Sequence, residues 1–225
     1  MARKALIRSN FYPYHIVNRT LDQKFYDLDN KLLWSIYTDC LCILTWVYGV
    51  RIHAFVLMSN HYHLLLSTPD ENLDDAIRYL QTEVSKQVAS YKGSSSYRFE
   101  SRYKWSIIYN RSHYINVLKY VYQNPLRGGI STRIAGYRWS TAHGALGYSR
   151  LLVPLYLHDF QLHSFYDPMQ LEDHEKWLNA LISEDDVVSI RAGLRRFEFK
   201  NSNRYVSARK KVAGVCKKVA GTRKK

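Results

Sequence analysis

The sequence is poor in cysteine, with only Cys40, Cys42 and Cys216 among its 225 residues. Their number is odd, and the first two are separated by one residue in a predicted helix, where their side chains face different directions. This spacing predicts neither a disulfide framework nor a zinc knuckle. A reducing compartment is the simpler inference, so we expect the protein in the cytoplasm.

Long apolar runs are also missing. The longest, Leu32 to Val50, is interrupted by Ser35, Thr38 and Asp39, which excludes it as a membrane span. The first residues, Met1 to Arg8, have neither the apolar core nor the small-residue cleavage site of a signal peptide. We therefore expect a globular protein without a membrane partner, whose 46% hydrophobic content supports one core, or one core plus a small appendage.

Acidic residues are scarce: 19 Asp and Glu stand against 33 Lys and Arg, for a net charge of +14. Such a balance indicates a polyanionic partner, by default nucleic acid, and would associate the protein with a bacterial nucleoid. Nine basic residues and no acidic residue lie between Asn201 and Lys225, which leaves a net charge of +5 for the first 200 residues. We predict that this tail is a phosphate-binding arm or, alternatively, a solubilising tail; it includes Arg209, Lys210 and Lys211.

Hydrophobic periodicity predicts an α+β fold. We expect strands at 11–17, 51–57, 61–67 and 102–109, and helices at 29–48 and 73–91. The order strand, helix, strand, strand, helix, strand is that of a ferredoxin-like βαββαβ unit with an antiparallel sheet.

The rest of the chain is expected to be mostly helical. Ser112 is predicted to cap a helix that reaches Asn124, where Pro125 interrupts it. Beyond Gly147 we expect an extended segment at 151–156 and helices at 169–182 and 183–196. These predictions divide the chain into residues 1–147, a helical C-terminal extension at 148–200 and the basic tail at 201–225.

The triplet His61-Tyr62-His63 stands inside an apolar strand. Because side chains alternate along a strand, both histidines face the same way and Tyr62 faces the other. Two imidazoles on an apolar element are costly to bury unless something binds them, and a divalent metal is a common partner. The alternative is a pair of core or edge histidines satisfied by backbone carbonyls.

A second motif, Lys119-Tyr120-Val121-Tyr122-Gln123-Asn124-Pro125-Leu126-Arg127, follows about sixty residues later. With the segment around His61 and His63 it resembles the single-tyrosine HUH transposases, and most of all their REP-associated branch, over about Tyr12 to Ala145. That family pairs a His-hydrophobic-His strand with a helix reading Tyr-x-x-x-Asn-Pro-hydrophobic-Arg. Ser59, where the family favours Pro, and the polar Tyr62 depart from the pattern without removing a ligand.

The resemblance implies a metal-dependent transposase or nickase. Tyr120 would be the nucleophile that attacks single-stranded DNA, leaving a 5′-phosphotyrosine and a free 3′-hydroxyl that can later be rejoined. His61, His63 and Asn124 would bind Mg²⁺ or Mn²⁺, although two imidazoles also suit Zn²⁺ or Ni²⁺. Tyr122 is the less favoured nucleophile. No nucleotide cofactor is needed, in agreement with the absence of a GxxxxGK loop.

The resemblance also implies a hairpin DNA partner. Expected DNA contacts come from the N-terminal segment, the loop after the first strand, the fourth strand, the loop after the helix bearing Tyr120, and the tail: Arg3, Lys4, Arg8, Asn18, Arg19, Arg102, Lys104, Arg127, Arg209, Lys210 and Lys211. Insertion-sequence relatives act as dimers, but the long C-terminal region here favours a monomer. Two alternatives stay open: a descendant that binds hairpins without cutting them, and an RNA-binding ferredoxin-like domain.

Overall fold

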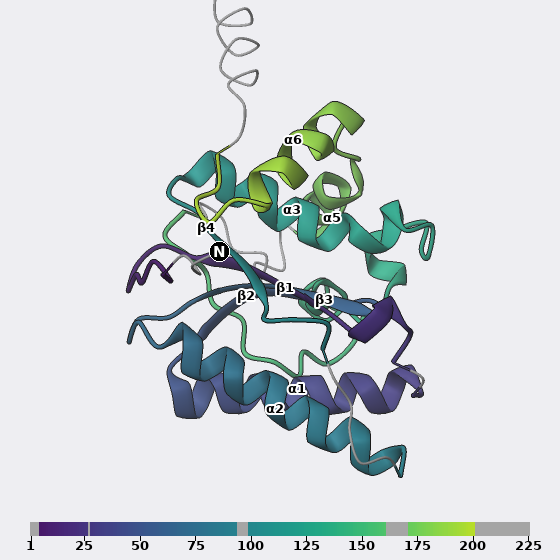
Figure 1. Cartoon of the computed structure of the whole chain (residues 1–225). Helices are drawn as coiled ribbons and strands as arrows, with labels where there is room; N and C mark the ends of the chain where they lie inside the picture. The colour runs from purple at the N-terminus through teal and green to yellow at the C-terminus, as the bar shows by residue number, and fades with distance from the viewer. Residues whose placement is uncertain (1–4, 27, 94–98, 161–170, 201–225) are drawn as a thin grey trace, which may run out of the picture.

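A computed structural model of the chain describes residues 5–26, 28–93, 99–160 and 171–200. Its centre is a four-stranded antiparallel sheet in the order β2-β3-β1-β4. The strands are β1 (Tyr14–Arg19), β2 (Arg51–Leu57), β3 (His61–Ser67) and β4 (Lys104–Ile107). Helices cover both faces of this sheet (Figure 1). The α+β, ferredoxin-like fold expected from the sequence is confirmed.

The helices α1 (Asn30–Tyr48) and α2 (Leu73–Tyr91) cover one face (Figure 1). Asp29 caps α1 by accepting hydrogen bonds from two backbone N–H groups of the first turn, and Gly49 ends it with a φ of 64°, which favours glycine. Both helices begin and end as the sequence predicts. Their apolar sides form one core with residues of the sheet.

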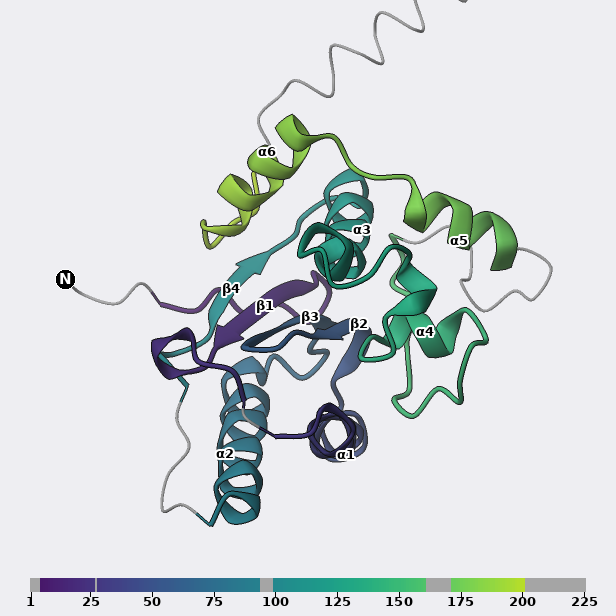
Figure 2. The same ribbon diagram turned by 90° about the vertical axis from the view of Figure 1, so that its right-hand side faces the viewer.

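The opposite face is covered by α3 (Arg111–Arg127), with α5 (Leu171–Asn179) and α6 (Glu184–Leu194) packed against α3 (Figure 2). Two short elements, η2 (Ile134–Gly136) and α4 (Thr141–Ala145), lie between them in sequence, and η1 (Leu21–Gln23) follows β1. These elements share a second core with the sheet. No helix among the described residues is both long and apolar enough to cross a membrane.

The alternation of side chains along β3 separates the two cores. Tyr62, Leu64 and Leu66 belong to the core beneath α1 and α2, whereas Leu65 belongs to the core beneath α3. His61 and His63 share the parity of Leu65 and therefore face α3. The predicted hairpin bounds of β2 and β3 are confirmed, apart from a shift in register between Ile52 and Ala54.

Several predicted boundaries were wrong. Asn110, not Ser112, caps α3 by accepting from the His113 N–H, and the helix continues past Pro125 to Arg127. The first strand is shifted and the fourth is shorter than predicted: β1 covers 14–19 instead of 11–17, and β4 covers 104–107 instead of 102–109. The described chain has no strand at 151–156.

Helix α3 continues past Pro125 because the side chain of Asn124 replaces a missing backbone donor. Proline has no N–H, so the Val121 carbonyl loses its usual helical partner at position 125. The Asn124 Nδ2 donates to this carbonyl at 3.2 Å and to the Tyr120 carbonyl at 2.9 Å. These two hydrogen bonds fix the orientation of the Asn124 amide.

Gln123 holds the connection between α5 and α6 against α3. Its side chain is fully buried; Nε2 donates to the carbonyls of Leu178 and Ala180, and Oε1 accepts from the Ile182 N–H. Because three backbone groups would lose a partner together, Gln123→Met should destabilise the fold by about 3 kcal/mol. This loss corresponds to a drop in melting temperature of about 10 °C.

Thermal unfolding followed by circular dichroism checks this prediction. Gln87→Met is the matched control, because Gln87 lies half-buried on α2 and bonds only side chains. Equal melting temperatures for the two variants would contradict the anchoring role of Gln123.

Candidate active site

The paired histidines lie where β3 begins, in the middle of the sheet. In the pairing of β1 with β3, His61 lies opposite Arg19 and His63 opposite Val17. The two imidazole rings are 5.1 Å apart between centroids. The prediction that they share one face of the strand is confirmed, and Tyr62 is buried on the other face.

Asn60 fixes the tautomer of His61. The Asn60 Nδ2 donates to the Gln23 carbonyl at 2.8 Å, which turns Oδ1 towards His61 Nδ1 at 2.7 Å. Since Oδ1 can only accept, His61 Nδ1 carries the hydrogen and Nε2 keeps its lone pair. The His61 ring can therefore coordinate a metal ion through Nε2.

His63 has a similar support from β1. Its Nδ1 lies 2.9 Å from Nε2 of the buried His15, and the two rings stack with centroids 5.2 Å apart. When His63 donates from Nδ1, its Nε2 is the ligating nitrogen, an arrangement common among metal-binding histidines.

Burial keeps both imidazoles neutral, which is the form that binds metal. Burial, followed by the charge of Arg19, lowers the pKa of His61 to about 4. For His63 burial is again the first cause, and His15, His61, Arg19 and Arg191 add to it, so that its pKa lies well below the ordinary value.

Tyr120 and Asn124 lie one helical turn apart on α3 and face the histidines. The rings of His63 and Tyr120 meet edge to face with centroids 5.9 Å apart. Asn124 is 8% exposed, and with Nδ2 engaged in the helix its Oδ1 has no hydrogen bond within the described residues. Two imidazole nitrogens and one amide oxygen are thus available to a cation.

Tyr120 differs from its neighbouring tyrosines in having an uncommitted hydroxyl. The part of the chain that the structure describes offers this hydroxyl no hydrogen bond, and 6% of the residue remains exposed. Tyr122 donates to the His53 carbonyl and lies 3.1 Å from Thr141 Oγ1 in the core, where burial raises its pKa. Tyr103, also near the histidines, donates to Asp74.

A cleft of about 1040 Å³ contains His61, His63, Tyr120 and Asn124 together. Its walls come from β1, β3, β4, α3 and α6. Six of its lining residues are basic and one, Glu100, is acidic, the basic ones being Arg19, Arg102, Lys104, Arg127, Arg191 and Arg195. An electropositive cleft of this size suits a phosphate backbone.

The four-stranded fold is similar to that of a solved protein. No protein-family model and no curated protein sequence matches the chain. A solved REP-associated tyrosine transposase bound to a REP hairpin is similar to it with a TM-score of 0.56 and 18% sequence identity, over 73% of this chain and 96% of that one. This chain has the fold of that transposase. The fold that the two motifs imply is therefore confirmed.

A second structure, a Deinococcus radiodurans R1 protein described as a transposase, is similar with a TM-score of 0.36 and 17% identity, over 54% of this chain and 94% of that one.

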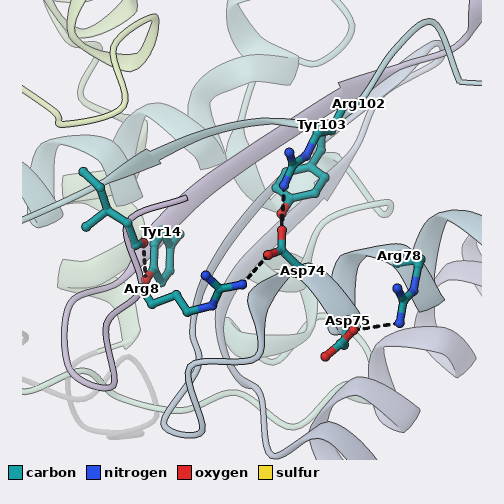
Figure 3. A network of polar contacts seen from close by, with 8 residues as sticks. Arg8, Tyr14, Asp74, Asp75, Arg78, Arg102 and Tyr103 are labelled. Atoms are coloured by element: carbon teal, nitrogen blue, oxygen red, sulfur yellow. Dashed lines mark hydrogen bonds and ion pairs between the residues drawn. The ribbon is translucent and has the colours of Figure 1, made fainter. Parts of the chain in front are cut away.

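The expected DNA contacts divide into three groups. Asn18, Arg19, Arg102, Lys104 and Arg127 line the cleft. Arg8 lies outside it and pairs with Asp74 at 2.8 Å, next to the pair of Arg102 with the same carboxylate at 2.6 Å (Figure 3). The remaining predicted contacts, Arg3, Lys4, Arg209, Lys210 and Lys211, lie outside the described residues.

Some of these side chains already have structural roles. Arg127, whose side chain is 8% exposed, pairs with Glu184 and donates to the Ile182 carbonyl, so it joins α3 to α6. Asn18 is buried and donates to the Ser101 carbonyl.

Sequence reasoning missed four residues of this site. His15 and Asn60 support the histidines, and Arg191 and Arg195 bring α6 to the cleft. Asn60 stands beside His61 in sequence, so its role as a partner could have been suspected. Nothing in the sequence shows how β1 pairs with β3 or which side of α6 faces the site.

Proposed function

We propose that this protein is a metal-dependent transposase or nickase that cleaves and rejoins single-stranded DNA at hairpins through a 5′-phosphotyrosine. The observation that carries the proposal is the meeting of His61, His63, Tyr120 and Asn124 in one electropositive cleft. The similar REP-associated transposase, solved with a REP hairpin, supports the hairpin as the DNA partner.

The residues present fit a divalent cation. His61 and His63 offer Nε2 nitrogens, Asn124 offers Oδ1, and the described residues contain no competing cluster of three His, Cys, Asp or Glu side chains. When bound, Mg²⁺ or Mn²⁺ would polarise the scissile phosphate and stabilise the charge that develops on it. A cation bound by these three protein ligands would have further coordination positions for phosphate oxygens.

Tyr120 performs the bond exchange in this proposal. Its hydroxyl oxygen attacks phosphorus and loses its proton to solvent, while the bond from phosphorus to the 3′-oxygen breaks and that oxygen leaves as a hydroxyl. The phosphotyrosine retains the energy of the broken bond, so attack by another 3′-hydroxyl restores the tyrosine and rejoins DNA. The basic lining of the cleft holds the backbone during both steps.

One chain supplies every residue of this site. The two histidines, the tyrosine and the asparagine all lie on elements of a single polypeptide that meet in the same cleft. This arrangement supports a monomer as the acting species, in contrast to insertion-sequence relatives that complete their sites in trans.

Labelled hairpin oligonucleotides test the proposal. With Mn²⁺ or Mg²⁺, a hairpin from the DNA flanking the coding sequence should yield a covalent adduct on a denaturing gel, which chelation by EDTA abolishes. A 3′ label should migrate with the protein, whereas a 5′ label should appear on a released fragment ending in a 3′-hydroxyl.

The control is a fully duplex oligonucleotide of the same sequence, which should give no adduct. Parallel reactions with Zn²⁺ and Ni²⁺ establish which cation serves. Tight binding of the hairpin without an adduct under any metal would instead favour a hairpin-binding protein that does not cut.

A further inference from the structure

Helix α6 supplies two arginines to the cleft. Arg191 lies in its last turn and Arg195 is its C-terminal cap, so the two are one turn apart on the same side of the helix. Both line the cavity that contains Tyr120, His63 and Asn124. Figure 2 shows α6 beside α3 and near β4, far along the chain from the motifs that define the site.

The described residues provide no ionic partner for these two arginines. Within the described ranges neither forms an ion pair, whereas the cleft residues Arg102 and Arg127 are paired with Asp74 and Glu184. A pair of unneutralised guanidinium groups lining a largely basic cavity is unfavourable until an anion enters. Arg191 and Arg195 are therefore available to a ligand, unlike the paired arginines.

Helix α6 is held firmly enough to position them. Val187 and Ile190 are buried in the core beneath α3. Gly193 packs so closely on Phe199 that an added Cβ would come within 2.8 Å of its ring. The chain then returns to the sheet, where the Phe199 N–H donates to the Ile107 carbonyl of β4.

The C-terminal part of α3 makes the remaining anchors. Arg127 pairs with Glu184 in the first turn of α6, and Gln123 bonds the segment before it. These two residues flank Asn124 in sequence. The position of α6 is thus tied to the same turn of helix that presents the proposed metal ligand.

Arg191 shares the cleft with a second arginine, Arg19. Arg19 stands at the end of β1, opposite His61 in the pairing with β3, and lines the same cleft as His63 and Arg191. An anion that enters the cleft would therefore meet basic residues of both β1 and α6.

We propose that Arg191 and Arg195 form a phosphate-binding site for the single-stranded DNA backbone, which holds the strand along α6 as it passes Tyr120. The inference rests on the proposed function and gives residues 184–195 a role in it. Guanidinium groups bind phosphate oxygens through paired, charge-assisted hydrogen bonds, which is why arginine suits such a site. A strand held between α6 and β1 would run through the centre of the cleft.

The salt dependence of binding tests this site. Fluorescence anisotropy with a labelled hairpin carrying single-stranded flanks, in EDTA to prevent cleavage, gives the affinity of the full-length protein. The double variant Arg191→Gln/Arg195→Gln should bind at least about tenfold more weakly. Its slope of log affinity against log salt should be shallower by about 1.4, since each single-strand phosphate contact contributes about 0.7.

Arg196→Gln is the matched control, because Arg196 is the next exposed arginine in the chain but does not line the cleft. Its affinity and slope should equal those of the unaltered protein. Arg191→Lys/Arg195→Lys should restore most of the slope, since the charges remain, but less of the affinity. A double glutamine variant that binds like Arg196→Gln would overturn the inference.

The outcome separates this inference from the proposed chemistry. If the unaltered protein forms no adduct but the glutamine pair still loses affinity and slope, the phosphate site stands and the cleavage proposal fails. If the protein forms its adduct and the glutamine pair is unchanged in binding, the cleavage proposal stands and the phosphate site fails.

Discussion

The Tyr120→Phe variant is expected to form no covalent adduct with hairpin DNA while binding the hairpin with unchanged affinity. Phenylalanine keeps the ring that meets His63 edge to face, and it removes only the hydroxyl that would attack phosphorus. Loss of a nucleophile typically costs several orders of magnitude, so the rate should fall at least about 10⁴-fold. Single-turnover cleavage on denaturing gels, together with anisotropy binding, measures both quantities.

Tyr122→Phe provides the control for this experiment. Tyr122 lies two residues away on the same helix, but its hydroxyl is committed to the His53 carbonyl and Thr141 in the core. Its removal should lower stability by about 1 kcal/mol and leave the adduct intact. An adduct that persists in Tyr120→Phe and disappears in Tyr122→Phe would show that the wrong tyrosine has been assigned.

The sequence was sufficient for the fold because periodicity and turn residues agree along the first 110 residues. Asp29 and Gly49 mark both ends of α1, and the three residues between Leu57 and His61 mark the hairpin. The α3 helix was harder to delimit. Proline normally ends a helix, and only the structure shows that the Asn124 side chain replaces its missing donor.

The site was predictable where its residues are close in sequence and not where tertiary contacts bring them together. Alternation alone places His61 and His63 on one face, and helical spacing places Tyr120 near Asn124. The contact between His15 and His63 depends on the register of β1 with β3, across 48 positions of sequence. Arg191 depends on the packing of α6 against α3, which no local pattern encodes.

For the charged residues, too, the sequence does not show the tertiary contacts. Sequence counts identify Arg102 and Arg127 as basic neighbours of the motifs, but not the carboxylates of Asp74 and Glu184 that partner them. Consequently the strongest candidates for free phosphate contacts shift to Arg19, Lys104, Arg191 and Arg195, which form no ion pair within the described part of the chain.

His61→Ala is expected to abolish cleavage and to weaken Mn²⁺ binding, with hairpin affinity in EDTA little changed. Removing one of three ligands withdraws Lewis-acid stabilisation worth several kcal/mol, so the cleavage rate should fall at least about 10³-fold. Isothermal titration with Mn²⁺ measures the metal independently of cleavage. Because burial holds the pKa of His61 to about 4, Mn²⁺ affinity of the unaltered protein should change little between about pH 8 and pH 6, where an ordinary imidazole already gains protons.

Asn60→Ala and His113→Ala complete the series. Asn60 is not a proposed ligand but fixes the tautomer of His61, so its loss should weaken Mn²⁺ binding about 10-fold to 100-fold, the usual effect of an outer hydrogen-bond partner. His113 is half-buried at the start of α3, where its ring contacts Phe199, and it lies outside the cleft, so its variant should bind Mn²⁺ normally. The loss of Mn²⁺ affinity should therefore be largest for His61→Ala, smaller for Asn60→Ala and absent for His113→Ala. This order is expected only if His61 is a ligand. If His61 were a core histidine, its substitution would lower the melting temperature and leave the Mn²⁺ isotherm unchanged.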